Sequence, residues 1–302
     1  MNFCIIDKLS IEYAHTLYYC KGECTLLTRT YVIVGGSGIV GSLISQYLIM
    51  RGYDVCIIDN RPPAFYGHTR ARFYCVDLLK DPLDSIIPHY LHGKHIVVLN
   101  AAMVRTPENG GPPTEAEWNC RSHDLNPLLA DTVIKACIYR RAHVKALYYI
   151  STLSVYDIEY YRQNGILIPE NVDLGRCASS GYGIGKLQAE RMHIVAESSG
   201  LCSTGIIRLS TPKDRYDADT NWFKTGKAYI LTKEDCSRGV ERVLTQNMHP
   251  KGCVVYQLDS LNPSIVQMDS VRALGYVPQY LLGVTCNRLP PYFHTGAHFI
   301  IE

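Results

Sequence analysis

The sequence predicts an α/β fold in which helices cover both faces of a doubly wound parallel sheet. Two observations lead to this prediction. Short apolar runs rich in β-branched residues alternate with longer segments that have helical periodicity. The first of these runs, YVIVGG, ends in glycines and is followed directly by a helical pattern. Because strands that alternate with helices are joined by parallel crossovers, one open sheet is expected.

The elements follow in order along the chain. Six strands are expected in the main sheet, at residues 31–36, 54–59, 72–77, 94–102, 146–152 and 204–210. Helices are expected between them at 39–51, 124–140 and 182–197. A helix at 233–246 and a short strand at 252–258 are expected to add to the main sheet. The chain is thus divided into an N-terminal extension of unknown role (1–29), a main domain (30–210) and a small C-terminal portion (211–302).

Three stretches lack this rhythm and are predicted to be loops. Residues 107–119 are rich in Pro and Gly, whereas residues 157–180 and 211–228 are polar and irregular. These stretches follow the fourth, fifth and sixth strands. Ligands of open α/β sheets bind beyond the carboxyl ends of the strands, so these loops are placed where a substrate would bind.

The composition excludes several classes of function. The chain is 47% hydrophobic and 19% charged with a formal net charge of +2, so no strong field favours nucleic acid or an anionic membrane. The longest apolar runs, such as residues 96–99 and 147–150, are too short to span a bilayer. Charged residues interrupt the first apolar stretch, MNFCIIDKLSIEY, which is unlike a signal peptide. We therefore expect a cytoplasmic protein.

The twelve cysteines are scattered, and several lie inside apolar runs, where a free thiol behaves as a small hydrophobic group. With no export signal we expect them to be reduced. Cys20 and Cys24, with His15 upstream, could hold a metal ion. Because no second pair stands at a useful distance, no metal site is predicted.

A glycine pattern, Gly35-x-x-Gly38-x-x-Gly41, stands between the first strand and the first helix. Glycines in this context allow a tight turn and close approach of the backbone to a pyrophosphate, which the helix N-terminus also attracts. Asp59 ends the next strand, 18 residues after Gly41, where a carboxylate accepts from a ribose 2′-hydroxyl and repels a 2′-phosphate. This arrangement predicts NAD rather than NADP, although Arg61 weakens the preference slightly. The alternative is a structural turn with no ligand.

Tyr182 and Lys186 are four residues apart at the start of a predicted helix and so share one face. Such a spacing alone could be an ordinary helical turn. The stretch YISTLSVY, however, places Thr152 at the end of the fifth strand, across the same cleft. A phenol titrates near ~10 in solution, and a neighbouring ammonium and the positive nicotinamide ring both stabilise its ionised form. Tyr182 could then take a proton from a substrate alcohol while Thr152 orients the reacting oxygen. The alternative readings are a core Thr and a helix-capping Ser.

With these motifs in place, the chain resembles the extended short-chain dehydrogenases/reductases, also called the NAD-dependent epimerase/dehydratase family. The motifs GGSGIVG, IIDN, VDL, VVLNAA, YISTLSVY, GYGIGK and IIRLSTP carry the resemblance from about Tyr31 to about Tyr276. It implies a Rossmann-type NAD-binding domain at 30–210 with Thr152, Tyr182 and Lys186 as catalytic triad, and a substrate-binding portion at 211–302. It also implies contacts with NAD by a larger set of residues: Gly35, Gly38, Ile39, Val40, Gly41, Asp59, Asn60, Asp77, Leu78, Asn100, Ala101, Ala102, Tyr182 and Lys186.

The resemblance also bears on the reaction. Dehydratases of this family carry Thr-Asp-Glu where this chain has Thr152, Leu153 and Ser154, so sugar dehydration is disfavoured. The C-terminal part is more loosely similar to small uronate dehydrogenases. We therefore expect an NAD-dependent oxidoreductase that acts on an alcohol carbon of a sugar or sugar acid. The alternatives are a nucleotide-sugar (UDP-sugar) 4-epimerase and, from another class, a catalytically silent NAD-binding regulator.

Two further expectations concern partners. Ser151 and Arg208 are candidate substrate-binding residues, and Arg208 could either pair with a substrate carboxylate or be a structural residue of the sheet. The helices at 124–140 and 182–197 match the pair that forms a four-helix dimer interface in the family, which implies a homodimer.

Overall fold

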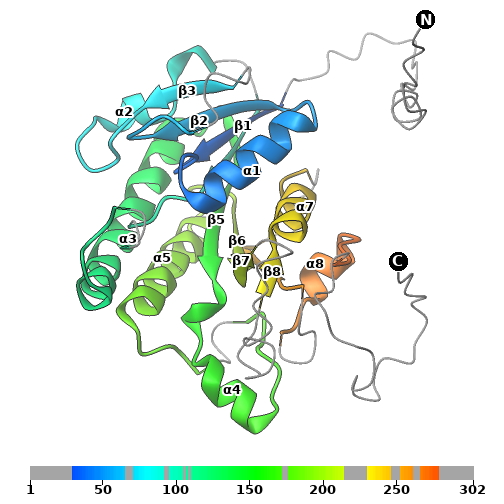
Figure 1. Ribbon diagram of the computed structural model, residues 1–302. Helices are drawn as coiled ribbons and strands as arrows, with labels where there is room; N and C mark the ends of the chain where they lie inside the picture. The colour runs from blue at the N-terminus through cyan, green and yellow to red at the C-terminus, as the bar shows by residue number, and fades with distance from the viewer. Residues whose placement is uncertain are drawn as a thin grey trace, which may run out of the picture.

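A computed structural model (Figure 1) confirms the α/β class and the doubly wound sheet. It describes residues 29–64, 71–91, 95–104, 107, 110–171, 176–213, 230–245, 252–260 and 266–278. The main sheet has seven strands in the order β3-β2-β1-β4-β5-β6-β9, and every neighbouring pair is parallel. Its strands are β1 (Arg29–Val34), β2 (Asp54–Asp59), β3 (Arg72–Cys75), β4 (His95–Asn100), β5 (Val144–Thr152), β6 (Thr204–Leu209) and β9 (Val254–Leu258).

Helices cover both faces of this sheet (Figure 1). The longer ones are α1 (Ile39–Met50), α3 (Glu115–Tyr139), α5 (Gly181–Ser198) and α7 (Lys233–Leu244). Helix α3 packs on α5, and α1 packs on α7. The shorter elements are α2 (Leu83–Ile86), η2 (His89–Leu91), η4 (Leu153–Val155), α4 (Ile158–Asn164), α8 (Asp269–Ala273) and a separate parallel pair, β7 (Thr211–Lys213) with β8 (Ile230–Thr232).

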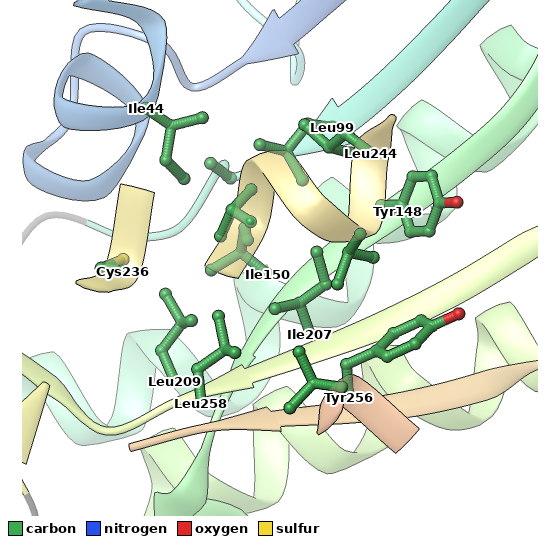
Figure 2. Packing of buried hydrophobic residues seen from close by; sticks show 14 of the residues in the cluster. Ile44, Leu99, Tyr148, Ile150, Ile207, Leu209, Cys236, Leu244, Tyr256 and Leu258 are labelled. Atoms are coloured by element: carbon green, nitrogen blue, oxygen red, sulfur yellow. The ribbon is translucent and has the colours of Figure 1, made fainter. Parts of the chain in front are cut away.

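The two faces of the sheet have separate hydrophobic cores because successive side chains of a strand point to opposite faces. In β1, Tyr31 and Ile33 belong to one buried cluster, whereas Val32 and Val34 belong to the other. Figure 2 shows the first cluster, in which residues from α1 and α7 pack over alternate residues of the strands: Ile44, Leu99, Tyr148, Ile150, Ile207, Leu209, Cys236, Leu244, Tyr256 and Leu258. Burial on both faces explains why these strands read as continuous apolar runs.

The structure departs from the prediction in all three predicted loops, since β7 also lies at the start of the predicted loop 211–228. Helix α3 begins at Glu115 rather than at residue 124, so the end of the predicted loop 107–119 is helical. The hydroxyl of Thr114 accepts from the backbone N–H of Glu117, and acidic residues occupy the first turn, which stabilises this earlier start. The polar stretch 157–180 also contains a helix, α4.

The C-terminal portion adds to the main sheet, as predicted. Strand β9 pairs with β6, and α7 packs beside α1. The predicted extension 1–29 lies outside the described residues except for Arg29, and so do Cys20, Cys24 and His15. In the part of the chain that the structure describes, no helix is long and apolar enough to cross a membrane, and no cluster of His, Cys, Asp or Glu could hold a metal ion.

Candidate active site

The predicted site residues meet at the carboxyl ends of the central strands. The strand order reverses between β1 and β4, whose following loops therefore run in opposite directions along the sheet. This is the position at which open α/β sheets form a ligand crevice. The glycine turn follows β1, Asn100 ends β4, and Thr152 ends β5. The sequence motifs thus converge on one edge of the sheet.

The glycine turn is packed so closely that a Cβ on Gly35 or Gly41 would overlap backbone atoms. Gly35 has φ +75°, and a Cβ there would lie 2.6 Å from the backbone nitrogen of Ala102. A Cβ on Gly41 would lie 2.2 Å from the carbonyl oxygen of Gly35. A Cβ on Gly38 would approach only that same oxygen, at 3.3 Å. Gly38 is the N-cap of α1 and provides no side-chain cap, so the turn is built like a cradle for an anionic group.

Asp59 stands beside this turn at the end of β2. Its Oδ2 accepts from the backbone N–H of Ser37 at 3.0 Å, while the hydroxyl of Ser37 donates to the carbonyl of Arg61 at 2.6 Å. These bonds fix the carboxylate next to the cradle, with Asn60 directly after it. A ribose attached to a phosphate in the cradle would therefore meet a negative charge, which fits NAD better than NADP.

The remaining cofactor candidates lie at the end of β4 and in the segments that follow β3 and β4. Asp77 accepts from the backbone N–H of Leu79 at 3.0 Å, and this bond lowers the pKa of the Asp77 carboxyl. Asn100 accepts from the N–H of Ala102 at 3.1 Å. The Nδ2 of Asn100 and the hydroxyl of Ser151 are both buried. Neither group has a hydrogen-bond partner among the described residues. Buried polar groups of this kind fit a site that a polar ligand completes.

The three catalytic candidates lie at the end of β5 and in the first turns of α5. Burial raises the pKa of Tyr182 to about 12, and the nearby side chain of Thr152 opposes this shift. Lys186 donates from Nζ to the carbonyl oxygen of Ile150 at 3.0 Å and lies 4.7 Å from the centre of the Tyr149 ring. Burial lowers the pKa of Lys186 to about 7, and the nearby Glu190 carboxylate opposes this shift.

These pKa shifts describe what the residues can do. Near neutral pH the phenol of Tyr182 is protonated and can act as an acid. As a base it must be stabilised as phenolate, which requires positive charge nearby. Lys186 is held on the same helix one turn away, and its titration near neutrality makes its charge sensitive to any group that enters the site.

Close contacts of α5 with its neighbours fix the position of Tyr182. A Cβ on Gly181 would lie 2.4 Å from the carbonyl oxygen of Asn119, and one on Gly183 would lie 2.2 Å from that of Ser154. The backbones of α3 and η4 therefore touch the first turn of α5 directly. The hydroxyl of Ser180 caps this turn by accepting from the N–H of Gly183 at 3.1 Å.

Trp118 is a site residue that the sequence reasoning placed in a loop and gave no role. Its ring stacks on the Tyr182 ring, with centroids 4.7 Å apart and an interplanar angle of 28°. The indole Nε1 donates to the carbonyl of Val104 at 3.3 Å. The pattern Thr114-x-x-Glu117 is a helix-start signal and could have placed Trp118 on the first turn of a helix.

The sequence left two roles open for Arg208, and the structure supports the structural one. Its side chain is 0% exposed and forms a two-point ion pair with Glu190, Nε to Oε1 at 2.9 Å and Nη2 to Oε2 at 2.7 Å. Its Nη1 donates to the Tyr156 hydroxyl and the Glu170 carbonyl. A guanidinium committed in this way holds β6, α5 and the loop after α4 together, and we do not assign it to a substrate carboxylate.

Comparison with known proteins places this geometry in a family. The model of the NAD dependent epimerase/dehydratase family matches residues 31–221, which is more than half of the chain. The chain belongs to this family. The family is NAD-dependent, and its members are enzymes of the extended short-chain dehydrogenase/reductase type, as expected from the glycine turn and the triad.

Solved structures of the same fold are similar over most of the chain. A UDP-galactose 4-epimerase has 14% sequence identity and a TM-score of 0.61, with 84% of this chain and 94% of that chain covered. A UDP-glucuronic acid 4-epimerase from Bacillus cereus, solved with UDP-glucuronic acid and NAD, has 17% identity and a TM-score of 0.59, with 85% and 95% covered. A short-chain dehydrogenase/reductase superfamily protein from Agrobacterium tumefaciens with bound NAD has 18% identity, a TM-score of 0.52, and 76% and 77% covered. No match was found among curated protein sequences.

Proposed function

We propose that this chain transfers hydride between NAD and an alcohol carbon of a sugar or sugar acid, with Tyr182 as the acid/base. The observation that carries the proposal is the Tyr182 phenol, which lies near the Thr152 side chain and one helical turn from Lys186. Bound NAD would supply the acceptor for the hydride. Tyr182, as phenolate, would take the hydroxyl proton. Loss of the hydride from carbon and of the proton from oxygen converts the alcohol to a neutral carbonyl.

The other two members of the triad support this proton transfer. The Thr152 hydroxyl can hydrogen-bond the reacting oxygen and hold it against the phenol. A protonated Lys186 stabilises the phenolate, since an ammonium one turn away favours the ionised form. The same set run in reverse reduces a carbonyl, with Tyr182 as the acid.

Dehydration remains disfavoured for a chemical reason. Elimination of water needs a carboxylic acid and a base beside the sugar. Leu153, which follows Thr152, is fully buried, and the Ser154 hydroxyl accepts a hydrogen bond from Thr152 at 3.2 Å. Neither side chain can carry the proton that elimination requires.

A UDP-sugar 4-epimerase is the second candidate. Two of the similar solved structures are UDP-sugar 4-epimerases, and one of them was solved with a UDP-sugar and NAD. The commitment of Arg208 to Glu190 also removes one argument for a sugar acid as substrate. Residues 214–229, within the predicted substrate segment, lie outside the described residues. A catalytically silent regulator is less well supported, because it would have no need of an assembled triad.

One experiment separates these functions. Calorimetric titration with NAD and NADP is followed by NADH absorbance over a panel of uronates, aldoses and UDP-sugars, with product analysis for epimers. NADH that accumulates with one sugar or sugar acid supports the dehydrogenase. Epimer formation without net NADH supports the 4-epimerase, because an epimerase regenerates its NAD. NAD binding without any turnover supports the regulator.

We further propose that the enzyme is a cytoplasmic homodimer formed through α3 and α5, which overlap the helices predicted at 124–140 and 182–197. Large apolar side chains are exposed on both, including Leu128 on α3 and Ile194 and Val195 on α5. Apolar side chains exposed along a helix pair suit an interface between two copies of the chain.

A further inference from the structure

Helix α3 reaches the catalytic phenol through the side chain of Trp118. The indole and phenol rings are stacked at 4.7 Å. We propose that Trp118 is a positioning residue that sets the orientation of the Tyr182 ring and keeps water from one of its faces. This inference rests on the proposed role of Tyr182 as acid/base.

Trp118 is itself held in place, which a positioning residue requires. Its Nε1 donates to the carbonyl of Val104, in the segment that follows β4. Its backbone lies in the first turn of α3, which the Thr114 hydroxyl caps by accepting from the N–H of Glu117 at 3.2 Å. An indole with its N–H bonded and its backbone helical has little freedom to rotate.

The residue next to Trp118 fixes the backbone of Tyr182. The Oδ1 of Asn119 accepts from the N–H of Tyr182 at 3.1 Å, and the carbonyl of Asn119 touches Gly181. Consecutive residues of α3 therefore hold the main chain and the ring of the same tyrosine. Without the indole, the Tyr182 side chain could rotate away from Thr152 even if its backbone stayed in place.

The stacked indole is one of the groups that surround the phenol. Thr152 and the Tyr149 ring lie near the phenol on β5, and Lys186 follows on α5. Trp118 and Asn119, which both contact Tyr182 from α3, are uncharged. Trp118 thus excludes water without adding charge, and a misplacement of about 1 Å in such a site can cost about 100-fold in rate.

The first test compares Trp118→Phe with Trp118→Ala in the holoenzyme. We expect Trp118→Phe to keep most of the turnover, because a phenyl ring can still stack. Trp118→Ala should lower kcat roughly 10- to 100-fold with NAD affinity unchanged. Its pH–rate profile should also move to lower pH, since a phenol exposed to water ionises more easily. Turnover of Trp118→Ala equal to or above that of the parent would overturn the proposal, as would equal losses in both variants.

The second test needs no turnover. The chain has two tryptophans, so Trp222→Phe leaves Trp118 as the only indole. With NAD bound, emission from Trp118 should fall as pH rises and the stacked phenol ionises, because a phenolate in contact quenches an indole. A second substitution, Tyr182→Phe, should abolish this fall in emission. If the pH dependence of Trp118 emission is the same with and without Tyr182→Phe, the contact is overturned even in an active enzyme. Quenching in a protein that turns over no substrate would instead count against the proposed reaction and leave the contact standing.

Discussion

The phenolic oxygen of Tyr182 is the atom on which the proposed reaction depends. Tyr182→Phe removes this oxygen and leaves the ring stacked on Trp118, so the fold should be unaffected. We expect kcat to fall by about 10²- to 10⁴-fold, the usual contribution of a general acid/base. NAD affinity, measured by calorimetry, should change little. Tyr139→Phe, an exposed position on α3, is the matched control and should keep full activity. Full turnover by Tyr182→Phe would remove the acid/base role.

Asp59 carries the prediction about the nucleotide. Asp59→Asn keeps the side-chain shape and can still accept from Ser37, but it removes the negative charge beside the cradle. We expect the ratio of NADP to NAD dissociation constants to fall at least about tenfold, because a hydrogen bond to a charged group contributes about 1.5–3 kcal/mol. Calorimetric titration with both nucleotides measures this ratio. Asp84→Asn, on the exposed surface of α2, should leave it unchanged. An unchanged ratio in Asp59→Asn would mean that another residue selects the nucleotide.

Among the helices, α5 carries a buried histidine with no part in the proposed reaction. His193 is fully buried, its Nδ1 donates to the carbonyl of Ala189 at 2.8 Å, and its ring stacks on Tyr149 at 4.6 Å. Burial lowers the pKa of His193 to about 4, and nearby Lys186 adds to the shift. An unfolded histidine titrates near ~6.5, so the stability that this neutral side chain contributes is complete above that pH. It is lost as pH falls through about 4.

His193→Phe should therefore flatten the acid limb of stability. A phenyl ring can still stack on Tyr149 but binds no proton. Denaturant unfolding between pH 7 and pH 4 should show that the parent loses up to about 3 kcal/mol more free energy of unfolding than the variant. His123→Phe, at an exposed position of α3, should keep the acid limb of the parent. Parallel curves for the parent and His193→Phe would contradict this assignment.

How much the sequence predicts differs among these elements. The strands of the main sheet could be located because burial on both faces leaves continuous apolar runs, a local signal. The stacking of Trp118 on Tyr182 could not, because it joins residues on two helices that are distant in sequence. Arg208 was ambiguous for the same reason. Its partner Glu190 lies 18 positions earlier on another element, and a buried arginine looks the same in sequence whether it meets a ligand or a carboxylate of its own chain.

For the molecule as a whole, alternation of strands and helices was sufficient to predict the parallel sheet and the edge at which the site forms. The cofactor class followed as well, because a pyrophosphate is bound by backbone and helix N-terminus in a compact motif. The substrate does not follow in the same way. It would be recognised by side chains from several loops after different strands, and each loop can change without any effect on the sheet.

Assembly is the last property of the whole chain that can be tested. We expect a sedimentation mass twice the 34.0 kDa of one chain, with α3 and α5 of each copy at the interface. Val195 on α5 is 60% exposed, and Val195→Glu would place an unpaired carboxylate in that interface, which is costly to bury. This variant should shift toward the mass of one chain. Val277→Glu is the matched control, since Val277 is 65% exposed and follows α8, with its carbonyl bonded to Arg238 of α7. A parent protein that sediments as one chain at micromolar concentration would contradict the dimer and leave the catalytic proposal unaffected, because every residue of the triad comes from a single chain.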